Sequence, residues 1–321
     1  MSRAQCLHST WTSVPRQISL PASAVPAIIP GMLGALIRTL RPRQWVKNGF
    51  IFAALVFDGQ VASALPLLRT VAGFVVFCLA SSAVYVINDL ADIEEDRVHP
   101  AKRLRPLPSG ALPVPVARLA AAGLVLVALV AAWLLSTAFA AVVFAYVLLN
   151  LAYSLRLKHV PILDVFFVAA GFVLRVGAGE TLITVERFSP WLYVCTTLLA
   201  LFLALGKRRA ELKLLADSAG LHRRVLDGYT IPFLDQLLVI VSSTTIMAYS
   251  LYTFSAENLP GNHLMMLTIP FVIYGIFRYV WLAQVQDAGG APEDLLVSDR
   301  PLLATVIVWG LSATAILYLG T

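Results

Sequence analysis

The sequence predicts an all-α polytopic membrane protein, and three observations lead to this prediction. Of the 321 residues, 59% are hydrophobic and only 13% are charged, and the mean hydropathy is +0.81. A soluble domain usually carries about 25% charged residues. The apolar residues form long runs between polar loops, and no segment shows the alternation that is typical of a strand.

Residues 1–34 are rich in Ser, Pro and Ala and contain no acid, which predicts a disordered leader on the cytoplasmic side. Residues 35–321 are expected to form a single transmembrane catalytic domain. Nine apolar segments in it are each long enough, or nearly so, to cross ~30 Å of hydrocarbon. They are residues 45–64, 67–87, 114–135, 138–155, 161–179, 190–206, 231–254, 263–284 and 301–319. Mostly short connections predict antiparallel neighbours in a helical bundle.

The basic residues predict the orientation of this bundle. With nine crossings, nearly all Lys and Arg lie on the side of the segment that precedes the first span. Because Lys and Arg of short loops stay in the cytoplasm, we expect the N-terminus there and the C-terminus outside. The host membrane is expected to be a bacterial inner or plasma membrane. This pattern explains the formal charge of +6 without nucleic acid as a partner.

The densest polar stretch, Asn88–Arg97, follows directly after the second expected span. In one continuous helix, Asp89, Asp92 and Asp96 fall within an arc of roughly 60°, with Asn88 beside them. Carboxylates that face one way repel each other unless a cation neutralises them. The sequence therefore predicts a cation site on this face of the helix.

Hard oxygen ligands of this kind suit Mg²⁺, which binds through a few carboxylates together with substrate phosphates. The other two acids of the stretch, Glu94 and Glu95, point away from the site. The alternative is a solvated acidic helix end beside a basic loop. The predicted Mg²⁺ ligands are Asn88, Asp89, Asp92 and Asp96.

Two further groups of polar residues lie at the same predicted membrane boundary. Lys47 and Asn48 follow Trp45 into the first span, where they either turn toward a phosphate or anchor the span at the interface. Tyr153 and Lys158 lie at the end of the fourth span, where a lysine also commonly extends toward water.

A third group follows the sixth span. Lys207 and Glu211 are four residues apart and hence neighbours on one helix face. We expect these two residues to take part in function, whereas surface ion pairs are the interpretation for Arg208 and Arg209. Arg103, in the loop after the second span, is a further candidate substrate-binding residue.

Two arginines, Arg175 and Arg278, fall within or near expected spans. A charged side chain is costly there, so that it is functional or paired by default. The sequence identifies no partner for either. The segment 298–301 is expected to form a capping turn before the last span.

From about residue 35 to the end, the order of these motifs resembles the UbiA superfamily of intramembrane prenyltransferases. Three segments, RPRQWVKN at 41–48, NDLADIEEDRVHPAKRLRP at 88–106 and GKRRAE at 206–211, are similar to its decaprenyl-phosphate phosphoribosyltransferase branch. Typical aromatic prenyltransferases of the superfamily carry a second acidic motif, Asp-x-x-x-Asp, after the sixth span. The matching positions here are Lys207 and Glu211, so that one acid has become a cation.

The resemblance implies transfer of 5-phosphoribosyl from 5-phosphoribosyl 1-pyrophosphate to a polyprenyl (decaprenyl) phosphate, with release of pyrophosphate, for a cell-envelope pentose such as arabinan. Mg²⁺ is the implied cofactor, and the active site is expected at the cytoplasmic face. The implied catalytic residues are Asp92, Asp96 and Lys207. The implied substrate-binding residues are Lys47, Asn48, Arg103, Tyr153, Lys158, Lys207 and Glu211.

Two alternative functions remain open at this point. The first is prenylation of an aromatic acid or quinone precursor by an enzyme of the same fold. The second is a lipid-phosphate or cation transporter without turnover. The sequence also leaves open whether the chain forms a homo-oligomer.

Overall fold

The computed structural model describes residues 28–99, 102–185, 189–216, 228–288, 290 and 292–319. Within these ranges every regular element is an α-helix or a 3₁₀ helix (η), which confirms the all-α prediction. The elements are α1 (Ile28–Leu40), η1 (Pro42–Ile51), α2 (Phe52–Phe57), α3 (Ala64–Ala91), α4 (Ile93–Val98), η2 (Lys102–Leu104), α5 (Val114–Leu135), α6 (Thr137–Leu155), η3 (Leu157–His159), α7 (Leu163–Glu180), α8 (Pro190–Ala216), α9 (Ile231–Ser255), η5 (Leu264–Thr268), α10 (Ile269–Gln284), α11 (Pro292–Ser298) and α12 (Arg300–Leu319). Most of the expected leader lies outside the described residues, and α1 begins inside its last part.

In the described part of the chain, seven helical segments are long and apolar enough to cross a membrane, namely α3, α5, α6, α8, α9, η5 with α10, and α12. The predicted count of nine is not confirmed. The first expected span is divided between η1, α2 and the loop to α3. The fifth is α7, whose 18 residues include Asp164, Arg175 and Glu180.

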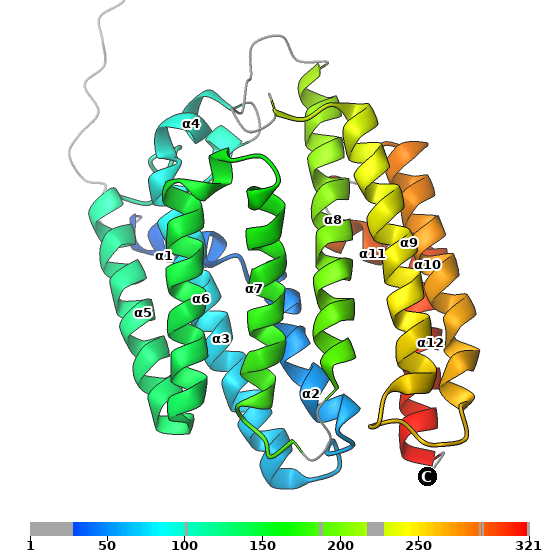
Figure 1. The fold of residues 1–321 in the computed structure, drawn as a ribbon. Helices are drawn as coiled ribbons and strands as arrows, with labels where there is room; N and C mark the ends of the chain where they lie inside the picture. The colour runs from blue at the N-terminus through cyan, green and yellow to red at the C-terminus, as the bar shows by residue number, and fades with distance from the viewer. Residues whose placement is uncertain are drawn as a thin grey trace, which may run out of the picture.

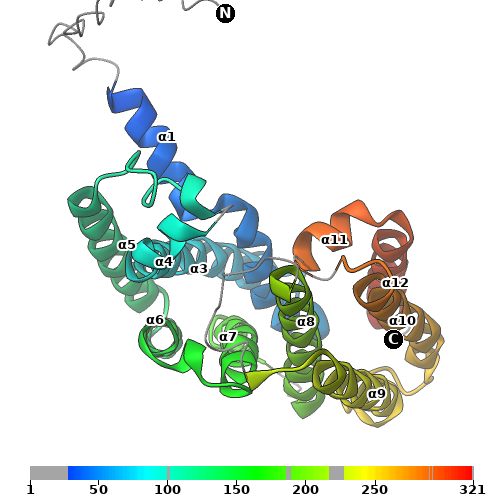
Figure 2. The same cartoon turned by 90° about the horizontal axis from the view of Figure 1, so that it is seen from above.

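The long helices run up and down the molecule, so that helices adjacent in the chain lie side by side (Figure 1). Seen along their axes, α5, α6, α7, α8, α9, α10 and α12 follow one another along an arc, and α3 packs against α5 and α6 (Figure 2). The short helix α4 caps one end of the bundle, which we call the α4 end.

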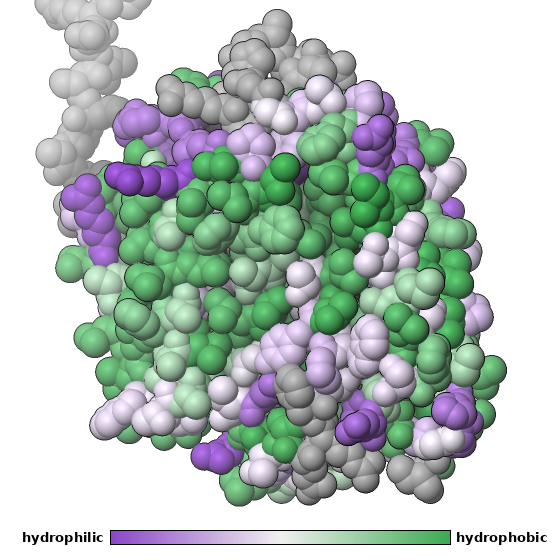
Figure 3. All heavy atoms as spheres, viewed as in Figure 1, coloured by the Kyte–Doolittle hydropathy of each residue, from purple (hydrophilic) through white to green (hydrophobic). Residues whose placement is uncertain are grey.

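The buried apolar core has two main parts. One lies between α3, α5, α6 and α7 around Phe77 and Phe139, and the other lies between α7, α8, α9 and α10 around Phe202 and Leu238. Many large apolar side chains nevertheless face outward, such as Leu119. These cover the sides of the molecule, whereas hydrophilic side chains gather toward its ends (Figure 3). This is the distribution expected of a protein whose sides face lipid.

Several helix boundaries follow capping signals in the sequence. Ser136 separates α5 from α6 and accepts a hydrogen bond from the backbone N–H of Phe139 at 3.4 Å. Thr230 caps α9 in the same way. Asp299 accepts from the N–H of Leu302 at 2.8 Å, which confirms the expected capping turn before α12.

Candidate active site

The first polar motif does not lie on one continuous helix. The helix α3 ends at Ala91 and α4 begins at Ile93, and Asp92 between them has left the helical conformation, with φ −98° and ψ 8°. The prediction that three aspartates share one helix face is therefore wrong. The break turns the four predicted metal ligands toward two different sets of neighbours.

Asp89 and Asp96 form the buried pair of this motif, with 2% and 1% of their surface exposed. Arg105 joins them, because its Nη1 lies 3.2 Å from Asp89 Oδ1 and 2.7 Å from Asp96 Oδ2. Arg41 also donates to Asp89, and Lys102 Nζ lies 3.7 Å from Asp96 Oδ1. Cations of the protein itself thus neutralise the two buried carboxylates.

Asn88 and Asp92 face the end of α6 instead. Ser154 donates a hydrogen bond to Asn88, and Lys158 forms an ion pair with Asp92. Lys158 is buried, whereas the Asp92 side chain remains 28% exposed. Asp92 is therefore the most accessible of the three aspartates.

The remaining residues of this loop lie outward. Glu94 and Glu95 are exposed, as predicted, and so is Arg103. Burial lowers the pKa of His99, and the nearby Lys102 ammonium acts in the same direction. Neutral His99 accepts a hydrogen bond from the backbone N–H of Lys102 at 3.3 Å, which orders the start of η2.

The second polar motif, on α8, is centred on a residue assigned above to the surface. Arg208 is only 4% exposed. Its Nε lies 2.5 Å from Asp164 Oδ2, and its Nη1 lies 2.5 Å from Glu211 Oε2. Its Nη2 donates to the hydroxyl of Tyr153 at 3.1 Å. Arg208 thus ties the ends of α6, α7 and α8 together.

The interpretation of Arg209 as a surface residue is also wrong, since only 6% of it is exposed. Its Nε lies 2.7 Å from Asp235, and its Nη1 donates to the backbone carbonyl of Ala283 at 2.8 Å. Arg209 therefore fastens α8 to α9 and α10 and points away from the first motif.

A loop residue completes the support of Asp164. Tyr229 donates a hydrogen bond to Asp164 Oδ1 at 2.7 Å and accepts one from the backbone N–H of Ile162 at 2.6 Å. Burial, followed by the bond to Asp164, raises the pKa of Tyr229 well above its usual value. Ile162 has a φ of 72°, a strained value for a β-branched residue, at the turn between Lys158 and Asp164.

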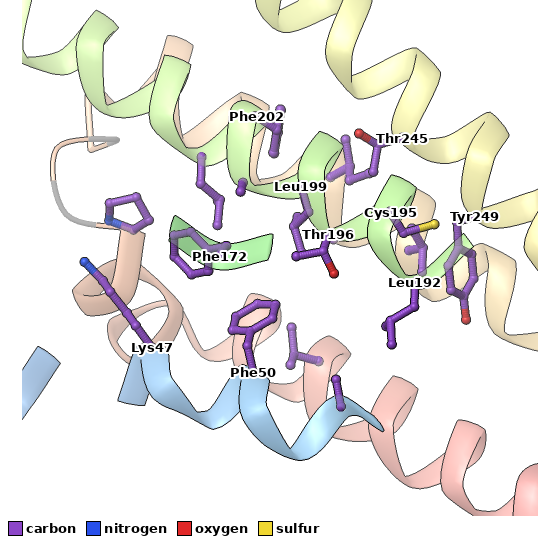
Figure 4. A pocket seen from close by; sticks show the side chains of 18 of the residues that line it. Lys47, Phe50, Phe172, Leu192, Cys195, Thr196, Leu199, Phe202, Thr245 and Tyr249 are labelled. Atoms are coloured by element: carbon purple, nitrogen blue, oxygen red, sulfur yellow. The ribbon is translucent and has the colours of Figure 1, made fainter. Parts of the chain in front are cut away.

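A cavity of about 760 Å³ runs along α8 and reaches the second motif, and Tyr85 lines it one helical turn before Asp89 of the first motif. Its lining includes α8 residues from Trp191 to Glu211, roughly 30 Å of helix length. Lys47, Tyr153, Lys207 and Glu211 line it toward the α4 end. Apolar side chains line its middle, and Figure 4 shows Phe50, Phe172, Leu192, Leu199 and Phe202 around the open space. The cavity therefore has a charged mouth and an apolar body.

Lys47 and Asn48 do not act together as expected. Lys47 lines the cavity at one edge of the open space (Figure 4), but Asn48 is completely buried on another face of η1. The amide of Asn48 donates to Ser81 at 3.0 Å and to the sulfur of Cys78 at 3.3 Å. Direct phosphate binding by Asn48 is therefore incompatible with its position.

Three arginines that pair with the buried acids of the two motifs, namely Arg41, Arg105 and Arg208, are not among the predicted site residues. A signal for them was present in the sequence, because carboxylates buried at a membrane boundary require nearby cations. All three lie in the motifs already identified. Which base would pair with which acid depends on tertiary contacts, however, and spacing along the chain does not reveal it.

The donor atoms of the first motif are of the type that Mg²⁺ prefers. Among the described residues, no group of three or more His, Cys, Asp or Glu side chains is arranged to hold a metal ion alone. Mg²⁺ usually keeps several waters and binds through one or two carboxylates plus substrate phosphates. The accessible carboxylate of Asp92 and the adjacent amide oxygen of Asn88 fit such a shared site.

Comparisons with known proteins identify the family to which this chain is similar. The model of the UbiA prenyltransferase family matches residues 49–298. A decaprenyl-phosphate phosphoribosyltransferase of Corynebacterium glutamicum is 35% identical over 283 residues, which cover 85% of this chain and 84% of the relative. The protein of the same name from Mycobacterium tuberculosis H37Rv is 34% identical over 284 residues, covering 87% of this chain and 92% of the relative.

The fold has solved counterparts. A UbiA homolog from Archaeoglobus fulgidus bound to DMAPP and Mg²⁺ matches with a TM-score of 0.68 and 20% sequence identity. The match covers 88% of this chain and 98% of that chain. At this identity the similarity establishes the helical architecture alone.

Proposed function

The chain belongs to the UbiA prenyltransferase family, and from this premise we propose that it transfers the 5-phosphoribosyl group of 5-phosphoribosyl 1-pyrophosphate to a polyprenyl phosphate, with decaprenyl phosphate as the first candidate. Pyrophosphate is the second product. The similarity to two decaprenyl-phosphate phosphoribosyltransferases over more than four-fifths of the chain supports the choice of this reaction within the family.

The observation that carries the proposal is the cation at position 207. Lys207 is exposed at the charged mouth of the cavity, where aromatic prenyltransferases of similar sequence pattern carry an acid. Lys47 and Lys158 lie at the same end of the bundle. A donor that carries both a pyrophosphate and a separate phosphate, next to a lipid phosphate, brings three anionic groups together. Lys47 and Lys207 at the cavity, together with Lys158 beside Asp92, match that demand.

The proposed donor site lies at Asn88 and Asp92, which would hold Mg²⁺ together with the pyrophosphate oxygens. Asp96, first expected to be a third ligand, is buried and paired with Arg105, and it would support the motif from behind. The bound ion would supply neutralisation of the charge that builds on the departing pyrophosphate. Asp89 takes a different role from the one first expected, because both Arg41 and Arg105 donate to its Oδ1. It would hold these two arginines in place beside the donor.

The proposed transfer requires one bond to break and one to form. The bond between ribose C1 and the pyrophosphate oxygen breaks, and its electron pair leaves with pyrophosphate. An oxygen of the polyprenyl phosphate, ionised near pH 7, supplies the pair for the new bond to C1. No proton moves in this exchange, so that a strong general base is unnecessary. The task of Lys47, Lys158 and Lys207 is to hold two anionic substrates in contact.

The apolar body of the cavity is the proposed site of the lipid tail. Phe50 of η1 and Thr305 of α12 line it from facing elements. Tyr318 donates to the carbonyl of Val56 at 3.2 Å and accepts from Val61 N–H at 3.3 Å, which joins α2 to α12 at the end opposite the α4 end. A lipid tail longer than the cavity would pass out of the bundle between η1 and α12, on the α4 side of the contact made by Tyr318. The α4 end is the proposed cytoplasmic face.

Pyrophosphate release from the purified protein tests this function. We expect release from phosphoribosyl pyrophosphate only when Mg²⁺ and a polyprenyl phosphate are both present. Release without the lipid contradicts the proposal. Prenyl transfer from an isoprenyl pyrophosphate to an aromatic acid would instead identify the alternative enzyme of the same fold, and the absence of any turnover would favour a transporter.

A further inference from the structure

The segment Pro42–Ile51 has an unusual conformation that separates two stripes of side chains. It forms a 3₁₀ helix of 10 residues, although such runs rarely exceed about four residues. In a 3₁₀ helix, residues three apart lie directly above one another. Lys47 and Phe50 form one stripe and line the cavity (Figure 4), whereas Asn48 and Ile51 form another and are 0% exposed. The conformation therefore decides which residues reach the substrate.

Two residues of α7 match the buried stripe. Arg175 Nε donates to Asn48 Oδ1 at 2.9 Å. Four residues further along α7, Gly179 lies so close to Ile51 that a Cβ at Gly179 would be 2.0 Å from the Ile51 carbonyl oxygen. Four residues of α-helix and three residues of 3₁₀ helix both advance ~6 Å along their axes. The two contacts thus repeat in register, and α7 acts as a template for η1.

The burial of the charged Arg175 guanidinium is energetically costly for a contact of this kind. Arg175 is 5% exposed, and its other nitrogens donate to the carbonyl of Gly171 at 2.7 Å and to the hydroxyl of Tyr146 at 2.9 Å. Within the described ranges of the chain, each hydrogen bond given by its guanidinium goes to a neutral group. Arginine is disfavoured at membrane depth unless it has a functional role.

A second route leads from Arg175 to the cavity. Its guanidinium lies 5.3 Å from the ring of Phe172, which packs edge-to-face on Phe50 with 5.1 Å between ring centroids. Both rings line the cavity. The same cation therefore contacts the buried stripe of η1 through Asn48 and reaches the cavity-lining stripe through Phe172.

We propose that Arg175 is a positioning residue that holds Pro42–Ile51 in its 3₁₀ conformation and thereby places Lys47 at the mouth of the cavity. The planar guanidinium is suited to this role because it gives several hydrogen bonds in fixed directions, which an ammonium does not. The inference deepens the proposed function, on which its kinetic test rests.

A double-mutant cycle provides that kinetic test. We expect Arg175→Met and Lys47→Ala each to raise the KM for the same anionic substrate about tenfold or more, because the first displaces the Lys47 ammonium from that substrate and the second removes it. The KM of the double variant should be no higher than that of the more affected single variant. Once Lys47→Ala has removed the ammonium, Arg175→Met has no ammonium left to displace. Asn48→Ala should reproduce Arg175→Met, and Arg175→Lys should restore only part of the loss.

Lys158 provides the matched control, because it lies on η3 and pairs with Asp92 rather than with η1. The effects of Arg175→Met and Lys158→Ala should multiply. If the effects of Arg175→Met and Lys47→Ala multiply as well, the positioning role is refuted. Should Arg175→Met fail to accumulate in the membrane, the cycle of Asn48→Ala with Lys47→Ala gives the same decision.

A labelling experiment keeps this inference separate from the proposed function. If the wild-type protein forms no product, Lys47→Cys can be modified with a charged, membrane-impermeant thiol reagent. We expect Arg175→Met to change the labelling rate of that cysteine several-fold, after subtraction of the label taken up by Cys6, Cys78 and Cys195 in protein without Lys47→Cys. Equal rates with and without Arg175 would overturn the proposal.

Discussion

The two polar motifs at the α4 end are built around opposite charges. In the first, the carboxylates of Asp89 and Asp96 are buried and basic side chains surround them. In the second, the guanidinium of Arg208 is buried and the acids Asp164 and Glu211 surround it. Each motif neutralises its own centre, as burial of an ion at a membrane boundary requires.

The difference between the motifs concerns the residue that each presents outward. The first leaves the carboxylate of Asp92 partly exposed, and the second leaves the ammonium of Lys207 exposed at the cavity. A metal-bound pyrophosphate requires the former, and a free phosphate requires the latter. The buried centres hold the helices together, while in the proposed function the outward residues meet the substrate. Substitutions at these two kinds of position should therefore have different consequences.

The largest effect is expected at Asp92. Asp92→Asn removes the accessible charge that would help to hold Mg²⁺, and pyrophosphate release should fall by about 10²–10³-fold or more, as for other groups that stabilise developing charge. Glu94→Gln is the control, because Glu94 is exposed and pairs with Arg97 at 2.7 Å on the surface. Wild-type turnover in Asp92→Asn would remove the first motif from the donor site.

The next largest effect concerns stability rather than turnover. Arg208→Met leaves Asp164 buried beside Tyr229 without its cation, which should cost about 3–5 kcal/mol. Thermal unfolding in detergent measures this loss. Adding Asp164→Asn should recover part of it, because the unpaired charge is then absent. If Arg208→Met unfolds at the wild-type temperature, the buried centre of the second motif has no structural role.

A smaller effect on turnover is expected at Lys207. Lys207→Ala removes one phosphate-binding cation and should reduce kcat/KM about 10–100-fold, the range of a hydrogen bond to a charged group. Lys213→Ala, on the same helix, should have little effect, because Lys213 pairs with Asp287 at 2.5 Å on the surface. Equal losses of kcat/KM in the two variants would indicate a general charge effect along α8. This result would contradict a specific phosphate-binding role of Lys207.

The smallest effect lies outside both motifs. The hydrogen bond from Arg278 lowers the pKa of Asp299, which caps α12. Because the folded pKa is below the unfolded value of about 3.9, this pair stabilises the fold above that pH, and its contribution is lost as the pH falls further. This pair joins only the C-terminal half of α10 to the start of α12, so that its loss should be the smallest of the four effects. Unfolding temperatures of wild type and Asp299→Asn should therefore converge as the pH falls below 4.

The membrane fold and the main motifs could be predicted from local sequence patterns. Apolar runs predicted most of the long helices within a few residues of their bounds, for example 114–135 for α5, although α8 continues ten residues past the expected end at 206. The first expected span is not one continuous helix. Its first part, η1, takes the 3₁₀ form through contacts with Arg175 and Gly179, which are more than a hundred residues away in the chain. Hydropathy alone does not contain that information.

The site was predicted in its residue types more than in its geometry. The acids of the first motif were identified because they are close together in the chain. The break at Asp92 was not, since the distant Lys158 pairs with Asp92 after the chain turns. Arg208 was assigned to the surface for the same reason, because its partner Asp164 belongs to another helix. Spacing along a helix describes one surface, whereas this site is assembled from several.

Mass spectrometry of the lipid products is the most direct test of the proposed reaction. The purified protein would be incubated with Mg²⁺, phosphoribosyl pyrophosphate and polyprenyl phosphates of several chain lengths. We predict that each accepted lipid gains one phosphoribosyl group, and that Asp92→Asn forms about 10²-fold less of this product or lower still. A wild-type reaction that leaves every polyprenyl phosphate at its original mass would contradict the assignment of this site to phosphoribosyl transfer.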